Sequence, residues 1–396
     1  MQEKISDKVE YINRVKDNVS GVKPKQIMGL YSNISSADCL LLNGAGRSLY
    51  SLRIAASKLA KNNPGLSVIT PEDVGFPDDT TYGALPKLEE MHKKISMFTS
   101  SGSGETETPL FNAEQVADYI ENTKSDKFTI DVITSKPDSP IGKLGKKYGS
   151  VLELKGRDEN LSSKDSKVIG IMGDIYELGS LVTGQSLNQM LCEKADYQKF
   201  YEIIETEFPI IGNVVDNFVR SETYDRFIDH IESRVSVHIG GRGVSREDAK
   251  MLGVRLGHIK HFLGDQVHII KSATDPPPRA MDVTLITSKS GGKQIYPGEK
   301  KGKEKKEANI VNWAKKHRNL GAKVFSIVGT ENSPLEKNSD YSFNLFGNGT
   351  KGNPSWFNTY AAYAESPIPA SLCQRLINRG LKIDPDIFKW YHAIAQ

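Results

Sequence analysis

Short apolar runs rich in β-branched residues alternate with helical patterns along the first half of the chain, and this alternation limits the possible folds more than any other feature. The runs cover residues 39–43, 66–70, 95–99, 128–134 and 151–154. Strands that alternate with helices form a parallel sheet with helices on both faces. We therefore predict an α/β fold of doubly wound parallel sheets in three layers, similar to flavodoxin or Rossmann folds.

Length and composition indicate two such units in an ordinary soluble protein. The chain has 396 residues, of which 38% are hydrophobic and 26% charged, and this is long for one domain. A net charge of +3 is too balanced to indicate nucleic-acid binding. No run approaches the ~18 apolar residues of a membrane-spanning helix, and charged residues interrupt the start of the chain. We expect a cytoplasmic protein that binds neither membrane nor nucleic acid.

The three cysteines do not indicate a disulfide or a metal site. Cys39, Cys192 and Cys373 are odd in number, far apart and without metal-ligand spacing. We expect three buried thiols, no metal and no cofactor.

Two helical stretches frame the first half. Apolar residues at 5, 9, 12, 15 and 19 form the stripe of an amphipathic helix that ends at Ser20 and Gly21. Residues 195–232 are helical in pattern throughout, and we expect them to break at Pro209 and to link the two halves.

A loop rich in glycine and hydroxyl side chains, residues 101–106, follows a predicted strand and precedes a helical pattern at 111–120. Glycines let the backbone approach a ligand closely, and the hydroxyls of Ser101, Ser103 and Thr106 can donate hydrogen bonds. The helix N-terminus adds N–H groups and partial positive charge. Such a loop suits a phosphate, and the alternative is a polar turn with Ser and Thr caps.

The order Ser-x-Ser-Gly-x-Thr in this loop resembles the phosphosugar-binding signature of the sugar isomerase (SIS) domain family. Residues 40–48 are similar to the first strand and Gly-x-Gly-x-Ser turn of that family, in the Gly-Ala-Gly-Arg-Ser form of 6-phospho-3-hexuloisomerases. Residues 133–140 resemble its next strand and Ser-Pro helix start, and residues 172–177 resemble the start of its last helix. The resemblance implies a phosphosugar site formed by Gly46, Arg47, Ser48, Ser101, Ser103, Gly104 and Thr106.

Parallel motifs in the second half predict an internal repeat. Residues 237–245 parallel the first glycine turn, with Ser245 at the position of Ser48. Residues 285–291 parallel the phosphate loop, with Ser288 at the position of Ser101. Ser333-Pro334 and Tyr363-Ala364-Glu365 repeat Ser139-Pro140 and Ile175-Tyr176-Glu177. We predict two SIS domains in tandem, residues 1–205 and 206–396, with linking helices at 206–232.

The second copy of the loop differs where chemistry is expected. Lys293 stands where the first copy has Thr106, and the segment before Ser333 is longer and carries a Lys/Glu/Gly run at 298–306. That run is typical of a solvated loop, and the alternative is a set of lysines that close over an anionic ligand.

The resemblance also implies the catalytic residues. Aldose-ketose isomerisation moves a proton through an enediol, which requires a carboxylate base but no metal or redox cofactor. The SIS isomerases are generally described with a glutamate at the position of Glu177, which is therefore the expected base. His258, in a segment similar to the Arg-Leu-Met-His of hexuloisomerases, is the expected second catalytic residue, with His261 as a fallback, because the first half offers only His92.

The sequence therefore predicts a phosphosugar isomerase of the aldose-ketose type, with a composite site that takes Glu177 from the first half and His258 from the second. We expect an internal pseudo-dimer that assembles into a homodimer and binds a phosphorylated sugar. Two alternatives stay open. One is a non-catalytic phosphosugar-binding regulator, and the other is a deglycase or deaminase of amino sugar phosphates.

Overall fold

The computed structural model describes residues 11–76, 83–157, 174–271, 275–293, 309–347, 349–383 and 387. Within them the chain forms two compact units. The N-terminal unit contains the described residues from 11 to 208, and the C-terminal unit contains those from 209 onward. The Lys/Glu/Gly run at 298–306 lies outside the described residues, as do the first ten residues and positions 172 and 173 of the last motif.

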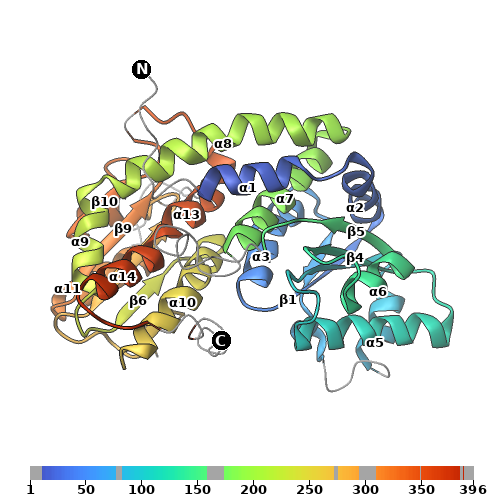
Figure 1. Ribbon diagram of the computed structural model, residues 1–396, viewed down its shortest axis with the longest axis horizontal. Coiled ribbons are helices and arrows are strands. Elements are labelled where there is room, and N and C mark those ends of the chain that lie inside the picture. Colours follow the sequence, from blue (N-terminus) through green and yellow to red (C-terminus); the bar gives the residue numbers. More distant parts are fainter. Residues whose placement is uncertain are drawn as a thin grey trace, which may run out of the picture. The chain divides into compact units, whose positions relative to one another are not determined.

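The N-terminal unit is built on a five-stranded parallel sheet of order β2-β1-β3-β4-β5. Figure 1 labels β1, β4 and β5 of this sheet. Its strands are β1 (Cys39–Gly44), β2 (Ser67–Ile69), β3 (Ile95–Ser100), β4 (Phe128–Thr134) and β5 (Gly149–Glu153). Its helices are α1 (Tyr11–Ser20), α2 (Pro24–Ser36), α3 (Arg47–Asn62), η2 (Pro71–Val74), α4 (Leu85–Met91), α5 (Glu107–Thr123), α6 (Pro140–Tyr148) and α7 (Asp174–Glu193). The predicted strands and the helix ending at Ser20 are confirmed.

Alternate residues of these strands face opposite layers of helices. One face packs Leu41, Met97 and Ile130 against α4, α5 and α6 in a continuous apolar core. Helices α2 and α3 pack on the sheet, and α7 packs on α1, α2 and α3. The buried carboxylate of Asp131 accepts hydrogen bonds from Ser96 at 2.8 Å and Ser150 at 2.6 Å, among others, so its role is structural.

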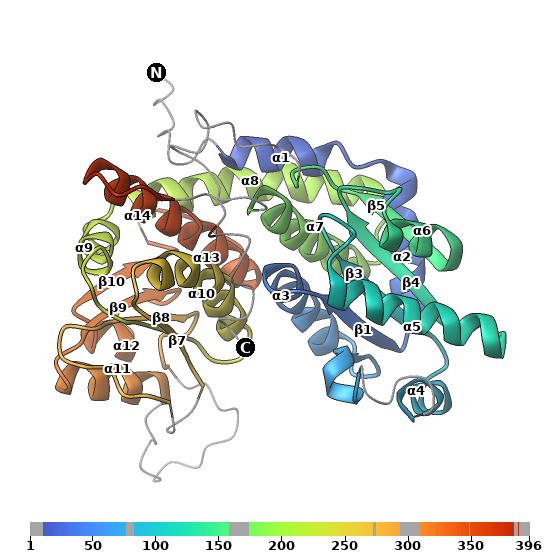
Figure 2. The ribbon, with the colours of Figure 1, turned by 60° about the horizontal axis from the view of Figure 1, so that its bottom comes forward.

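The C-terminal unit contains a second five-stranded parallel sheet, of order β10-β9-β8-β6-β7. Its strands are β6 (Val237–Gly240), β7 (Val267–Ile270), β8 (Val283–Ser288), β9 (Lys323–Val328) and β10 (Tyr341–Asn344). Its helices are α9 (Glu222–Ile231), α10 (Val244–Phe262), α11 (Asn309–Asn319), α12 (Pro334–Lys337), η5 (Pro354–Trp356), α13 (Phe357–Glu365) and α14 (Pro367–Asn378). Figure 2 shows α11 and α12 on one side of this sheet and α10, α13 and α14 on the other.

The two sheets have the same strand order, since in each the second strand lies at one edge, followed by the first, third, fourth and fifth. Both first turns begin a helix after a glycine of positive φ, Gly46 at 51° and Gly243 at 58°. The predicted fold class, α/β with helices on both faces of parallel sheets, is confirmed.

The predicted break at Pro209 is wrong. Helix α8 (Tyr197–Val219) runs through Pro209 without interruption. A proline removes one hydrogen bond from a helix, and here the flanking apolar residues Phe208 and Ile211 are buried, so packing holds the helix together. The chain turns instead at Ser221, whose hydroxyl caps α9 by accepting from the N–H of Tyr224 at 3.2 Å.

The prediction of three buried thiols is also wrong in part. Cys39 is buried in β1, but Cys192 is exposed and Cys373 is half-buried. Cys192 lies in the last turn of α7, where a helix commonly emerges from its packing surface. Burial raises the pKa of the Cys39 thiol to about 12, so this thiol is protonated at neutral pH.

Candidate phosphosugar site

The first glycine turn leads directly from β1 into α3. Gly46 precedes the helix with φ 51° and ψ −128°, a conformation that side chains with a Cβ rarely adopt. This turn places Arg47 and Ser48 in the first turn of α3, and both side chains are buried. Because β1 and β3 are neighbours in the sheet, with Gly44 opposite Ser100, the turn and the loop after β3 leave the sheet at the same edge.

The loop after β3 brings three hydroxyls together at the start of α5. The Oγ1 atom of Thr106 lies 3.5 Å from Ser101 Oγ and 3.4 Å from Ser103 Oγ. Thr106 is the N-cap residue of α5, but its side chain makes no capping hydrogen bond. The first N–H groups of a helix have no acceptor within it, so this end of α5 presents N–H groups, partial positive charge and hydroxyls together.

The loop is locked into a close fit with the start of α6. Gly104 has φ +66°, and a Cβ added there would lie 1.9 Å from the Oγ of Ser139. Ser139 caps α6 by accepting from the N–H of Gly142 at 3.3 Å. The carbonyl of Gly104 accepts from the N–H of Ile141 at 3.3 Å. The predicted Ser-Pro helix start therefore supports the loop and fixes its shape.

The first turn of α7 carries Glu177 into a buried group of charges. The guanidinium of Arg47 lies 2.5 Å from Asp174 Oδ1 through Nη1 and 2.9 Å from Glu177 Oε2 through Nε. All three side chains are at least nine-tenths buried. One guanidinium thus lies between both carboxylates of α7 beside the glycine turn, and the three side chains form one buried group of ion pairs.

Tyr176, next to Glu177, connects α7 to the phosphate loop. Its hydroxyl contacts Ser100 Oγ at 3.0 Å and donates to the carbonyl of Ile133 at 2.7 Å. A Cβ added at Gly102 would lie 3.0 Å from the tyrosine ring, so the loop backbone passes directly over it. Burial raises the pKa of Tyr176 above its usual value, which keeps the hydroxyl protonated. Glu177, Arg47 and the loop therefore belong to one connected arrangement.

Arg157 is a candidate that the sequence did not indicate. A Cβ added at Gly102 would lie 3.0 Å from Arg157 Cδ, so the arginine side chain borders the loop, and its backbone N–H donates to Ser135 Oγ at 3.3 Å. It follows β5 in a segment without a motif, and only the sheet order brings it to the loop.

The histidines are placed differently from one another. His258 is fully buried in α10 of the C-terminal unit, and His261 follows one turn later, half-buried. His92 precedes β3, at the edge of the sheet opposite the loop, where it lies 3.8 Å from Asp38. His92 is therefore excluded from the arrangement, and the catalytic assignment of His258 stays a prediction.

The C-terminal unit repeats the loop geometry with other side chains. The N–H of Gly291 donates to the carbonyl of Ser288, as that of Gly104 does to Ser101, both at 3.2 Å. A Cβ added at Gly291 would lie 2.2 Å from Ser333 Oγ. Lys293 donates to the carbonyl of Glu331 at 2.9 Å, so its ammonium already forms a hydrogen bond within the protein.

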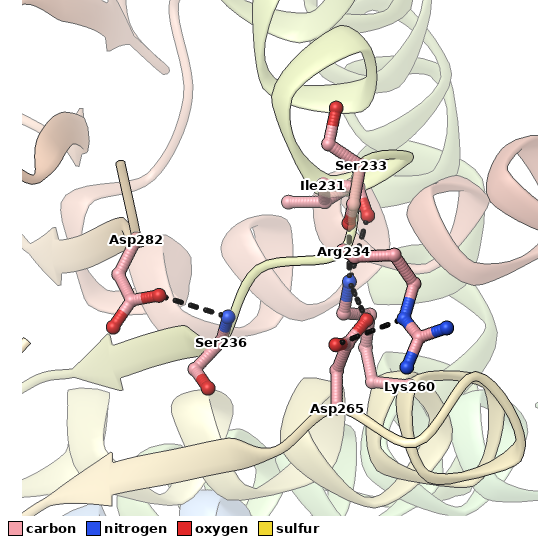
Figure 3. A network of polar contacts seen from close by, with 7 residues as sticks. All are labelled: Ile231, Ser233, Arg234, Ser236, Lys260, Asp265 and Asp282. Atoms are coloured by element: carbon pink, nitrogen blue, oxygen red, sulfur yellow. Dashed lines mark hydrogen bonds and ion pairs between the residues drawn. The ribbon is translucent and has the colours of Figure 1, made fainter. Parts of the chain in front are cut away.

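The charged groups of the C-terminal unit include one buried lysine with a structural role. Lys260 Nζ donates to the carbonyls of Ile231 and Ser233 and lies 3.0 Å from Asp265 Oδ2 (Figure 3). Burial lowers its pKa, although Asp265 opposes this effect. Two hydrogen bonds and one ion pair hold the ammonium, so the lysine ties the end of α10 to the segment before β6.

The described residues contain neither a candidate metal cluster nor a membrane-spanning helix. No group of three or more His, Cys, Asp or Glu side chains in the described ranges is arranged to hold a metal ion. None of the helices in these ranges is long and apolar enough to cross a membrane.

The fold of this chain is similar to that of solved phosphosugar isomerases. No protein-family model matches the sequence. An uncharacterized protein of Archaeoglobus fulgidus is 27% identical over 142 residues, which cover 36% of this chain and 66% of that protein, just under two thirds of its length.

Solved structures similar to this chain cover nearly all of it. Tagatose-6-phosphate ketose/aldose isomerase from Escherichia coli matches with a TM-score of 0.61 and 11% identity over 96% of this chain and 93% of its own. The C-terminal domain of glucosamine-fructose-6-phosphate aminotransferase from Francisella tularensis matches with a TM-score of 0.57 and 13% identity, covering 96% and 98%. Glucosamine-6-phosphate deaminase from Thermotoga maritima matches with a TM-score of 0.51 and 15% identity, covering 96% and 97%. At these identities the likeness establishes a shared fold.

Proposed function

We propose that this protein binds a phosphorylated sugar at the loop of residues 101–106 and isomerises it between aldose and ketose forms. The observation that carries the proposal is the connection of Glu177 to that loop. Tyr176 packs under Gly102, and the next residue presents a carboxylate at the same edge of the sheet. A phosphate held by the hydroxyls and by the start of α5 would anchor the sugar there.

In this proposal Glu177 is the base that moves a proton between adjacent carbons of the sugar. Arg47 acts as a positioning residue, because its guanidinium already contacts Glu177 and Asp174 and so fixes the carboxylate. Arg157, which borders the loop, supplies positive charge for the phosphate. His258 is proposed as the second catalytic group. We also infer that the two units descend from one duplicated domain, since they share strand order and loop geometry.

The test follows proton abstraction itself. The protein is incubated with hexulose, hexose and pentose phosphates in deuterated water, and exchange at the carbon next to the carbonyl is measured by NMR. Exchange should appear with at least one sugar, and Glu177→Gln should lower its rate by about two to four orders of magnitude with phosphosugar affinity nearly unchanged. The matched control is Glu365→Gln, which changes the buried glutamate of the C-terminal unit that accepts a hydrogen bond from Thr287 at 2.7 Å.

Exchange that persists in Glu177→Gln but is lost in Glu365→Gln would indicate that the base lies in the C-terminal unit. Release of ammonia from amino sugar phosphates would favour the deaminase alternative.

A specific observation favours the second candidate, a non-catalytic phosphosugar-binding regulator. Glu177 is only 8% exposed and already pairs with Arg47, as expected of a structural ion pair. A regulator needs the loop but no base. Tight binding of a sugar phosphate together with the absence of exchange across the whole panel would establish this alternative.

A further inference from the structure

The two sheets differ on the face that packs against α5 in the N-terminal unit and α11 in the C-terminal unit. Leu41 and His238 occupy equivalent positions, each seven residues before the serine of its glycine turn. In the N-terminal sheet, Leu41 is paired with Ile69 and Met97 in one apolar row. In the C-terminal sheet, the corresponding row is His268, His238 and Thr284. An apolar row has been replaced by three polar side chains.

The connection that covers this face is also shorter in the C-terminal unit. In the N-terminal unit the segment between β2 and β3 includes α4, whose Leu85 and Leu88 seal the apolar core. The segment between β7 and β8, residues 271–282, is about half as long, and no helix is assigned to its described residues. The polar row is therefore not sealed in the same way.

A cavity of about 320 Å³ opens at this position, within the range of small-molecule sites. It lies between β6, β7, the segment after β7 and α11. Its lining includes His238, His268, Lys271, Asn312, Trp313 and Lys316.

The histidines of the cavity have hydrogen-bonding capacity that the described residues do not use. His238 is 2% exposed and stacks on His268, with ring centroids 4.7 Å apart. Its Nε2 lies 3.5 Å from Asp282 Oδ2, but this buried nitrogen forms no hydrogen bond with any described residue. Asp282 is fixed in turn by the N–H of Ser236 at 3.0 Å, as Figure 3 shows. His268 forms no hydrogen bond with any described residue, so both rings can bind a ligand.

The charges and flat surfaces of the lining define the ligand. Lys271 and Lys316 outnumber the one lining carboxylate, Asp275, which also accepts from the backbone N–H of Lys271. Burial lowers the pKa of His238 to about 4, so its ring is neutral at pH 7 and offers a flat surface together with nitrogen atoms. The half-buried Trp313 adds a second flat surface.

We propose that this cavity binds a nucleoside monophosphate, whose base lies against the histidine stack and Trp313 while its phosphate faces Lys271 and Lys316. The amides of Asn309 and Asn312 can donate to and accept from the edge of the base. The position is separate from the glycine turn and loop of the C-terminal unit, because the polar row lies on the face of the sheet rather than beyond its strands.

The test is isothermal titration of the full-length protein with the 5′-monophosphates of adenosine, guanosine, cytidine and uridine, beside ribose 5-phosphate and inorganic phosphate. The protein carries Ser103→Ala and Thr106→Ala, so that the loop at 101–106 does not contribute. At least one nucleotide should bind with a stoichiometry of one, and more tightly than ribose 5-phosphate.

Two sets of variants examine the lining. Lys271→Ala with Lys316→Ala removes two exposed charges and should weaken nucleotide binding at least tenfold, whereas Lys337→Ala, an exposed lysine of α12 outside the cavity, should leave it unchanged. His238→Leu with His268→Ile restores the apolar row of the N-terminal unit, so folding should be retained while binding is lost.

Failure of all four nucleotides to bind at millimolar concentrations would overturn the proposal. Equal affinity for inorganic phosphate, ribose 5-phosphate and nucleotides would also overturn it, because the cavity would then recognise no base. Binding that is unaffected by both sets of variants would place the nucleotide elsewhere.

Discussion

Acidification should destabilise the C-terminal unit through two buried histidines. Burial lowers the pKa of His238 to about 4, with the neighbouring His268 adding to the effect and Asp282 and Asp275 opposing it. Burial likewise lowers the pKa of His317 to about 4, with His238 and Lys316 adding to the effect. The hydroxyl of Thr284, 2.8 Å from His317 Nδ1, is the uncharged partner of that ring.

The direction in which stability changes with pH follows from how many protons the folded and unfolded chains bind. Both histidines have a folded pKa below the unfolded value of 6.5, so the unfolded chain binds more protons between these values. Their contribution to stability is fully present above about pH 6.5 and is lost as the pH falls toward 4. From about pH 6.5 to 5.5 each histidine should lower the free energy of unfolding by about 1 kcal/mol, or about 2 kcal/mol for the pair.

Tryptophan emission isolates this unit, because Trp313, Trp356 and Trp390 all lie after residue 208. Urea titrations followed by emission at the two pH values give the difference in the free energy of unfolding. His238→Leu removes one of the two groups, so the loss on acidification should shrink by about half, whatever its effect on stability at neutral pH. An equal loss in the wild type and in His238→Leu would refute the reasoning.

Three further predictions concern the N-terminal unit. Arg47→Met leaves the buried carboxylates of Asp174 and Glu177 without their cation and should lower the free energy of unfolding of this unit by about 3–5 kcal/mol. Far-UV circular dichroism during urea unfolding measures the change. Arg53→Met, on the same helix, should have a smaller effect, and equal effects of the two variants would contradict the buried ion pairs. Gly104→Ala should abolish the stabilisation by phosphosugars seen in thermal melts, because the new Cβ would overlap Ser139. Gly75→Ala, also at positive φ but with no atom within 4 Å of the new Cβ, should retain this stabilisation. Stabilisation by phosphosugars in both variants would mean that the shape of the loop is not needed for binding. In the native protein Cys192 should react with a thiol reagent while Cys39 does not, because Cys192 is exposed and Cys39 is buried. Mass spectrometry identifies the labelled cysteine, and labelling of Cys39 before Cys192 would contradict this difference in burial.

The sequence predicted the strands of the first sheet because each is a short apolar run between helical patterns, so local pattern and tertiary role agree. The same agreement located Gly46 and Gly104, whose positive φ only glycine adopts easily. The break predicted at Pro209 was wrong because a proline interrupts a helix or not depending on how strongly the flanking residues pack. The presence of a proline in the sequence does not show how its neighbours pack.

The arrangement of charges could not be predicted in the same way. Arg47 and Glu177 are 130 positions apart, and their pairing depends on α3 packing against α7. Arg157 carries no motif, and the polar row of His238, His268 and Thr284 comes from three different strands. A pattern read along one segment does not contain the register between strands, so both the extra arginine and the cavity required the structure.

The fit between Gly104 and Ser139 has a consequence for protein engineering. Two segments separated by more than 30 positions share one volume, since the serine hydroxyl occupies the space that a side chain at the glycine would need. A phosphate loop transplanted from this chain into another scaffold as a contiguous hexapeptide would lose the surface against which it is shaped. A graft that works must carry the capped start of α6 together with the loop, as a two-part insert whose halves are exchanged at the same time.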